Sequence, residues 1–333
     1  KNISLRYRFV GYFNNANDYP SFFVPVILFY SKSHLGMSFS QTILIFYGLG
    51  FISSMFEIPA GSFGDKYGRK TSYLLGLSLM FIGFSIWLFV LPIGFYVIGS
   101  LCIGIGSAFR SGSISSIIFE EYAIENCAER YHIFQSRSVS FMYALRLISM
   151  PLGAYLYTVN ELLPIQMTLI FLVLSIVASF FISDKNITPE SHNARSIFKK
   201  TFKEIFASSE IKTLCLLVFV SAAYGNIIWR LFQPAYSELD LNVKYIGYFY
   251  TLFSLAGIVG SLKLGKIIER KKLFRIILIF FVIAMTVYML ASVSFNIYTV
   301  TLCVFTVSIF FPVSEAAVSS YLQHKFERYQ QAT

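Results

Sequence analysis

Charged residues are scarce in this chain. Of its 333 residues, 13% are charged and 56% are hydrophobic, whereas a soluble domain carries about 25% charged residues. A surface with half the usual charge is poorly suited to water. The many aromatic residues, 36 Phe and 22 Tyr, argue against a disordered chain. The composition therefore indicates a protein whose main solvent is a lipid bilayer.

Acidic residues are also outnumbered by basic ones, 17 to 27, which gives a formal net charge of +10. In a soluble protein this excess would suggest a nucleic-acid partner. Here the Lys and Arg residues stand between long apolar runs, as the positive-inside rule predicts for a membrane protein. We therefore expect membrane lipid around the chain and no nucleic acid.

Cysteine and histidine occur without any spacing that suits a metal site or a disulfide. The four cysteines lie far apart in the sequence, and the four histidines lie outside the apolar runs. No nucleophile–base pair is visible, and the glycine-bearing turn at 61–70 lacks the Gly-Lys-Ser/Thr ending of a phosphate loop. We therefore expect no metal, no cofactor and no enzymatic activity.

Long apolar runs recur along the whole chain. A spanning helix needs about 20 predominantly apolar residues. We predict ten such helices, at 8–31, 40–62, 72–92, 94–119, 138–158, 163–183, 211–236, 245–265, 273–294 and 296–322.

Lys and Arg residues gather in alternate joints between these spans. The opposite joints hold only Lys32 and Lys244. Because basic residues favour the cytoplasmic side, we expect the N-terminus and the loop 184–210 to be cytoplasmic. The loop follows six spans, so the sequence predicts a six-helix bundle over 1–183, a linker over 184–210 and a second bundle over 211–333.

A turn with three glycines and several charges separates the second and third predicted spans. Its sequence is Gly61-Ser62-Phe63-Gly64-Asp65-Lys66-Tyr67-Gly68-Arg69-Lys70. Anchoring at the membrane surface explains the basic residues. It does not explain the glycines, which can allow helices to approach closely, or the acidic Asp65 among the bases.

This turn resembles the signature of the major facilitator superfamily, Gly-x-x-x-Asp-Arg/Lys-x-Gly-Arg-Arg/Lys, which stands between helices two and three. The match is complete, and the preceding Glu57-Ile58-Pro59-Ala60 is similar to bacterial drug-efflux-type members. The resemblance implies an all-α membrane protein with two helical bundles. It also implies that the turn controls a conformational switch rather than contacting substrate, through Gly61, Gly64, Asp65, Lys66, Gly68, Arg69 and Lys70.

Two features depart from the family pattern. The corresponding loop of the second half, 260–272, has Leu264 where the acidic residue would stand. The family usually has twelve helices, and this chain reaches Thr333 where an eleventh would begin. Either the sequence is a fragment or the second bundle lacks its last two helices. In the family the loop aspartate faces helix eleven, so the role of Asp65 depends on that helix.

Several charges fall inside the predicted spans, where each costs at least about 2.5–3.5 kcal/mol. Asp18 lies ten residues beyond Arg8, and Arg110 lies ten residues before Glu120. At a rise of about 1.5 Å per residue, both stand about 15 Å from the cytoplasmic face. They form either a static ion pair or a proton-exchanging carboxylate whose pKa Arg110 tunes.

Four other charges are candidates for coupling or substrate binding. Glu57 and Arg146 lie in the inner half of their spans, where pairing or gate support is expected. Arg230 lies in the outer half of its span, and Glu315 has no assigned partner.

These observations predict a secondary active transporter that works by alternating access. The leading version is a monomeric, proton-coupled efflux antiporter for a small amphipathic compound in a bacterial inner or plasma membrane. The first alternative is an uptake symporter or facilitator for a polar metabolite. The second is a sensor or assembly protein that derives from a transporter and moves nothing.

Overall fold

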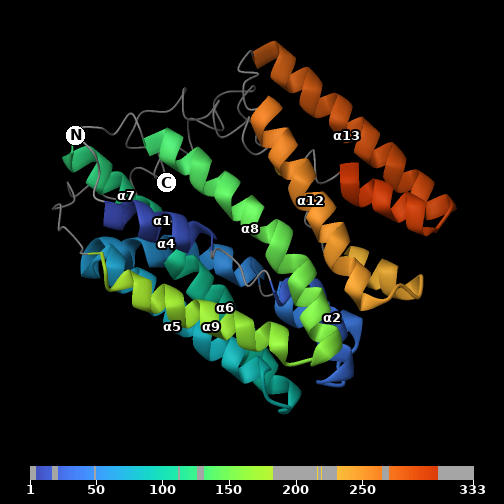
Figure 1. Cartoon of the computed structure of the whole chain (residues 1–333), viewed down its shortest axis with the longest axis horizontal. Coiled ribbons are helices and arrows are strands. Elements are labelled where there is room, and N and C mark those ends of the chain that lie inside the picture. The colour runs from blue at the N-terminus through green and yellow to red at the C-terminus, as the bar shows by residue number, and fades with distance from the viewer. Residues whose placement is uncertain are drawn as a thin grey trace. The chain divides into compact units, whose positions relative to one another are not determined.

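The structure is a computed structural model, and it describes residues 5–16, 22–48, 50–111, 113–125, 131–182, 216, 219, 231–264 and 270–306. All regular secondary structure in these ranges is helical (Figure 1). Contacts divide the chain into two compact units. The first is Lys1–Thr188 with Val243–Tyr248, and the second is Pro189–Asn242 with Phe249–Thr333.

The first unit is a bundle in which α5 packs on α6 and α9, and α1 packs on α8. Its elements are α1 (Leu5–Ala16), η1 (Val24–Val26), α2 (Ile27–Ser33), α3 (Phe39–Thr42), the π-helix η2 (Ile43–Gly48), α4 (Gly50–Tyr67), α5 (Arg69–Trp87), α6 (Ile93–Arg110), α7 (Ser113–Ile124), α8 (Tyr131–Val159) and α9 (Leu163–Ser179).

Five predicted spans match single helices to within a few residues at most ends. These are α5, α8, α9, α12 (Val243–Leu264) and α13 (Arg270–Val293). The predicted spans 211–236 and 296–322 fall largely outside the described residues, which include the helical stretches 231–238 and 297–306.

Three predicted spans are not single helices. The span 8–31 is divided between α1 and α2, and 40–62 contains the short α3 and the π-helix η2 before α4. The span 94–119 was wrong as one helix, because α6 ends at Arg110 and α7 begins at Ser113. The backbone of Ser111 is extended (φ −58°, ψ 143°) although its N–H still bonds to Ser107 O. This break matters below because it lies against the glycine-bearing turn.

The contact between α5 and α6 is made by glycines from both helices. A Cβ on Gly76 would lie 2.6 Å from Gly106 O, and a Cβ on Gly106 would lie 2.6 Å from Gly76 O. One heptad further on, a Cβ on Gly83 would lie 2.5 Å from Gly99 O. The two backbones therefore pack closely, as small residues allow between membrane helices.

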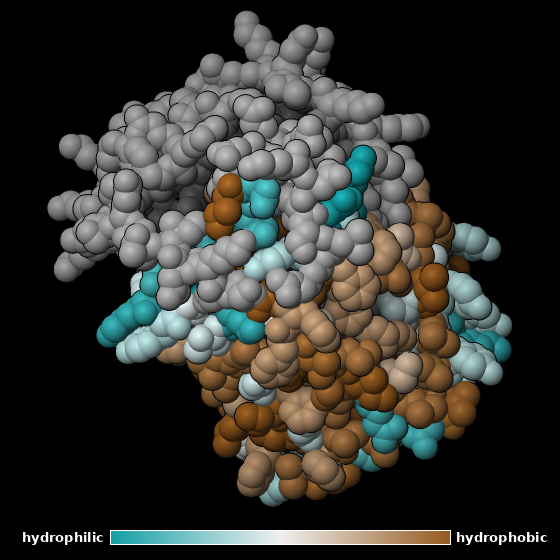
Figure 2. All heavy atoms as spheres, turned by 60° about the vertical axis from the view of Figure 1, so that its left-hand side comes forward, coloured by the Kyte–Doolittle hydropathy of each residue, from teal (hydrophilic) through white to brown (hydrophobic). Residues whose placement is uncertain are grey.

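The surface of the described residues is rich in exposed hydrophobic side chains. On the face drawn in Figure 2 it is mainly hydrophobic, with hydrophilic residues gathered mostly towards its margins. Among the described helices, Arg69–Trp87 and Ile93–Arg110 are both long and apolar enough to cross a membrane. Extended apolar surface of this kind is unusual in a soluble monomer and suits contact with lipid.

The second unit contains α12 from Phe249 onwards, α13 and the helical residues 297–306, which are orange and red in Figure 1. Val287, Ala291 and Cys303 form a small apolar core. The hydroxyls of Tyr236 and Thr301 lie 2.9 Å apart, so one donates a hydrogen bond to the other. This unit is thus held by both apolar packing and buried polar contacts.

Candidate functional site: the turn between α4 and α5

The turn between α4 and α5 is a one-residue reversal at Gly68. Gly68 has φ 97° and ψ 138°, a backbone conformation that residues other than glycine rarely adopt. Its N–H donates to Gly64 O at 3.0 Å, and its carbonyl accepts from Ser72 N at 3.1 Å. The backbone is therefore hydrogen-bonded on both sides of the reversal, and the following residues start α5 directly.

Arg69 connects this turn to α7. Its Nη1 lies 2.9 Å from Glu120 Oε1, and its Nη2 lies 3.5 Å from Asp65 Oδ1. The Glu120 side chain is 20% exposed, whereas that of Asp65 is 55% exposed. The shorter and less exposed contact with Glu120 is therefore the stronger of the two, because water screens exposed pairs.

Near the turn, two serines donate hydrogen bonds to the carbonyl oxygen of Phe109, which lies just before the break between α6 and α7. Phe109 O accepts from Ser113 Oγ at 2.8 Å and from Ser72 Oγ at 3.2 Å. Ser113 Oγ also lies 3.3 Å from Ser72 Oγ. The break after Arg110 thus gives α5 a polar attachment to α6 and α7 at the level of the turn.

The remaining basic residues of the turn have different surroundings. Lys70 Nζ donates to Ile182 O at 2.6 Å, just after α9, and lies 5.7 Å from the centroid of the Phe180 ring. Lys66 is exposed and lies 5.0 Å from the ring of Tyr67. Lys70 therefore attaches the turn to the end of α9, whereas Lys66 contacts only its neighbour among the described residues.

The expectation that the glycines of the turn allow close helix approach is wrong at Gly61. Among the described residues nothing lies within 4 Å of a Cβ placed there, and the nearest atom to one on Gly64 is Ser72 Cβ at 3.5 Å, an ordinary contact. Gly68 is required for its backbone conformation instead. Close approach occurs further along, where α5 meets α6.

The predicted intramembrane charges are only partly within the described residues. Asp18, Arg230 and Glu315 lie outside them. Arg110 is 6% exposed and ends α6, where a cation is favoured by the helix dipole. Glu57 is exposed on α4 and forms no ion pair with another described residue.

Buried polar groups occur on both α1 and α8, two helices that pack on each other. Asn14 of α1 is 1% exposed, and both its amide atoms lack a hydrogen-bond partner among the described residues. On α8 the same holds for Arg146 Nε, Ser138 Oγ and Ser149 Oγ. The Arg146 guanidinium lies 5.6 Å from the ring of Tyr143. Such groups are normally hydrogen-bonded when buried, so this interface offers polar atoms to a ligand or water.

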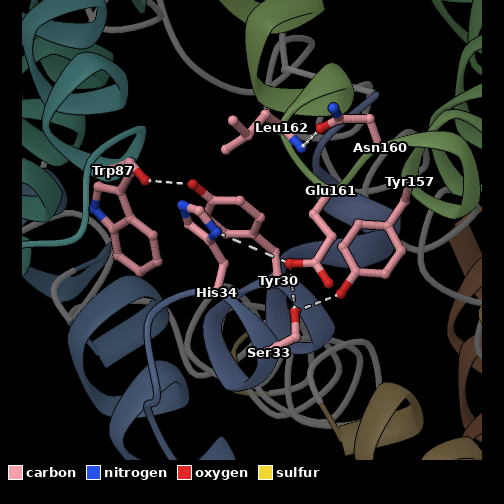
Figure 3. A network of polar contacts seen from close by, with 8 residues as sticks. All are labelled: Tyr30, Ser33, His34, Trp87, Tyr157, Asn160, Glu161 and Leu162. Atoms are coloured by element: carbon pink, nitrogen blue, oxygen red, sulfur yellow. Dashed lines mark hydrogen bonds and ion pairs between the residues drawn. The ribbon is translucent and has the colours of Figure 1, made fainter.

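A second polar network lies at the opposite end of α5 (Figure 3). Tyr30 OH donates to Trp87 O at 2.7 Å, and its ring stacks on His34. Ser33 Oγ donates to Glu161 Oε2 at 3.0 Å and shares a hydrogen bond with Tyr157 OH at 2.7 Å. His34 Nδ1 lies 3.9 Å from the same carboxylate. The network joins α2 to the α8–α9 connection.

Sequence reasoning missed Glu120, Ser72 and Ser113 as parts of the site. Their signal was weak, because a carboxylate or serine near a predicted membrane edge has many possible partners. The break that brings Ser113 towards Ser72 falls at Arg110-Ser111-Gly112-Ser113, where the Ser-Gly dipeptide is a turn signal that the predicted span 94–119 passed over. One signal could have indicated Glu120: it is an acidic residue at the end of a predicted span, on the same side of the membrane as the basic turn.

A bundle of long helices with extended apolar surface suits a protein that lies in a lipid bilayer. The family model described as Major Facilitator Superfamily matches residues 9–333. The chain belongs to this superfamily, which confirms the family predicted from the turn.

Two curated relatives are similarly described. An uncharacterized MFS-type transporter, YxaM of Bacillus subtilis, is 24% identical over 213 residues, which are 62% of this chain and 52% of that protein. An uncharacterized transporter, BU466 of Buchnera aphidicola, is 25% identical over 83% of this chain and 70% of its own length. The match to YxaM thus spans about half the length of that relative.

Solved structures share the fold at low identity. The nucleoside transporter NupG superposes with a TM-score of 0.72 at 12% identity, over 100% of this chain and 85% of that one. The D-xylose-proton symporter gives 0.68 at 12% identity, over 99% and 86%. These likenesses confirm the all-α, two-bundle fold predicted from the sequence.

Proposed function

We propose that this chain is a secondary active transporter that works by alternating access and exports a small amphipathic compound in exchange for protons. The observation that carries the proposal is the bridge from Arg69 to Glu120 and Asp65. The Glu120 pair fastens the α4–α5 turn to α7, and because both pairs are partly exposed, each is individually weak. A contact of this strength can break and re-form during a transport cycle. The family and the fold support the transport part, and the drug-efflux-like Glu57-Ile58-Pro59-Ala60 supports export.

We assign proton coupling to Asp18, whose carboxylate would bind and release the proton. Arg110 would keep the pKa of that carboxylate in a range where it can do both. A nearby guanidinium favours the ionised carboxylate, whereas desolvation favours the protonated acid, so the two effects oppose each other. Asp18→Asn is expected to abolish proton-driven accumulation of ethidium in inverted vesicles and to spare downhill counterflow.

A purely structural pair would behave differently. Asp18→Asn and Arg110→Gln would each lose folded protein, and the double variant would recover part of the yield. Proton coupling at the wild-type level in well-folded Asp18→Asn would end the assignment.

Uptake of a polar metabolite by symport is the second candidate. Asn14 and Arg146 favour it, because buried polar atoms without partners suit a ligand with hydrogen-bonding groups. The solved structures include carriers for a nucleoside and for D-xylose.

Antiport and symport are distinguished by measuring internal pH in liposomes that contain the purified protein and a pH-sensitive dye. Entry of ethidium with alkalinisation of the interior supports antiport. Entry of uridine or xylose with acidification supports symport instead.

The proposed membrane orientation places the N-terminus and the 184–210 loop in the cytoplasm of a bacterial cell. A single cysteine at Ser191→Cys, in a background without the natural cysteines, is expected to resist an impermeant thiol reagent in intact cells and to react after permeabilisation. Ready labelling of intact cells would reverse the orientation.

A further inference from the structure

Arg146 is a cation within a predicted span that has no anionic partner among the described residues. Its Nε is buried and forms no hydrogen bond with any of them. Its guanidinium lies 5.6 Å from the ring of Tyr143. A charge inside a membrane is costly unless another group pairs with it. The pairing expected for Arg146 from the sequence is therefore not seen in the described part of the chain, and an anion that binds there would supply it.

Two serines of α8 share the face of Arg146. Ser138 is fully buried and Ser149 is 9% exposed, and neither hydroxyl has a hydrogen-bond partner among the described residues. At 3.6 residues per turn, the three side chains lie within about 80° of one another around the helix. Because buried polar groups are normally hydrogen-bonded, three exceptions along one face indicate that a molecule binds beside them.

Helix α1 and helix α8 run in the same direction. The ring of Tyr12 lies 4.8 Å from that of Phe134 and 6.1 Å from that of Phe141. Further along, the backbone of Phe22, in the segment after α1, lies so close to Gly153 that a Cβ there would collide with it. Residue numbers thus rise together along the two segments, and Tyr12 lies at about the level of residues 134–141 of α8.

Asn14 lies near the polar face of α8. At about 1.5 Å per residue it stands about 3 Å beyond Tyr12, and therefore close to the level of Ser138. Helix side chains lean towards the N-terminus of their helix, and that of Arg146 does so, since its guanidinium lies beside Tyr143. The guanidinium is thus within about one helical turn of the level of Asn14. Asn14 is 1% exposed, and both its amide atoms are without a partner in the described ranges.

The chemistry of these groups suits a carboxylate. A guanidinium presents its donors in a planar fork that matches the two oxygens of a carboxylate. The amide of Asn14 and the hydroxyl of Ser149 can each donate a further hydrogen bond. One guanidinium balances one negative charge, which is the charge of a carboxylate, whereas a phosphate monoester carries about two.

We propose that Arg146, with Asn14 beside it, binds the carboxylate of the transported compound, which is therefore a small amphipathic monocarboxylate. The assignment rests on the proposed transport function and narrows its substrate to an anion. Tyr143 and Met142 are partly exposed and stand three and four residues before Arg146, so they are its neighbours on the helix surface. They offer apolar surface to the rest of the compound.

Binding to the purified protein in phosphatidylcholine nanodiscs tests the site, with naphthylacetate, phenylacetate and octanoate each compared with its neutral amide. Isothermal titration of the wild type should show at least one carboxylate that binds about tenfold more tightly than its amide, because a hydrogen bond to a charged group contributes at least that factor. Arg146→Gln should bind the carboxylate and the amide alike. Arg146→Lys keeps the charge and should retain a preference for the carboxylate.

Arg137→Gln is the matched control, because it removes the same charge from the same helix at an exposed position. It should keep the wild-type preference, and gel filtration checks that each variant is folded. In wild-type protein the bound carboxylate, but not its amide, should also protect Arg146 from phenylglyoxal, a measurement that needs no variant. Equal binding of every carboxylate and its amide by the wild type, or no binding of any carboxylate, would overturn the proposal. So would an unchanged preference in Arg146→Gln, or equal modification of Arg146 with and without carboxylate.

These measurements separate the carboxylate site from the transport function. A carboxylate preference that depends on Arg146, in protein that shows no counterflow of any compound, would refute transport and support the site. Counterflow of ethidium or uridine, by protein that binds carboxylates and amides alike, would support transport and overturn the site.

Discussion

Arg69 uses two different nitrogens for two carboxylates, one on its own turn and one on α7. Because the Glu120 contact is shorter and less exposed, Glu120→Gln should slow turnover more than Asp65→Asn, by up to about tenfold if about 1.4 kcal/mol is lost from the rate-limiting state. Neither change should alter ligand affinity much, since the turn is expected to control a conformational switch rather than to contact substrate. Turnover and affinity are measured separately in the same preparations.

Arg69→Lys is the control for charge alone. A lysine keeps the charge but cannot direct two nitrogens at two acceptors in a fixed fork, so it should resemble Glu120→Gln. Loss of affinity with unchanged turnover in any of these variants would show that the turn contacts ligand.

Alanine substitutions at Gly68 and Gly61 test whether the turn needs the backbone conformation of Gly68. Gly68→Ala forces a side chain into φ 97°, and backbone strain of this kind costs about 1–3 kcal/mol. Gly61→Ala meets nothing within 4 Å and has no such strain. Thermal unfolding of the purified variants should therefore show a drop of several degrees for Gly68→Ala and none for Gly61→Ala. Equal melting temperatures would contradict the conformational role of Gly68.

At the scale of elements, the α5–α6 contact should tolerate little added volume. A Cβ on Gly106 would lie 2.6 Å from a backbone oxygen of α5, whereas nothing lies within 4 Å of one on Gly94, on the same helix. Overpacking costs about 1–3 kcal/mol. Gly106→Ala should therefore lower the yield and melting temperature of folded protein, and Gly94→Ala should not. Matching behaviour of the two variants would mean that the helices can separate freely.

The elements also show where sequence reasoning succeeds and where it ends. Hydropathy located α5, α8, α9, α12 and α13, because long apolar runs have few alternatives in a membrane. It did not place the break after Arg110, because apolar residues resume at Ile114 and the turn signal in Arg110-Ser111-Gly112-Ser113 was passed over. The contacts of Arg69 with Glu120, and of Ser72 with Ser113, join residues far apart in the sequence. They depend on that break and on the glycine packing, which only the folded chain defines.

At the scale of the whole molecule, one completely matched motif and the alternation of basic and neutral joints were enough to predict the superfamily and its two-bundle fold. Substrate and coupling were not predictable in the same way. They depend on a few side chains whose surroundings vary between carriers of one fold, since fold does not determine function. The polar groups of α1 and α8 illustrate this, because of these groups only Arg146 stood out as a candidate in the sequence.

Counterflow by the purified protein in liposomes tests the central claim most directly. Liposomes are loaded with unlabelled ethidium, uridine or xylose and diluted into a trace of the same labelled compound, with no ion gradient. A carrier that alternates access exchanges internal for external compound, so the account predicts transient accumulation of at least one label, slowed in Glu120→Gln. Entry of every label at the rate of protein-free liposomes, from protein shown to be folded, would contradict it.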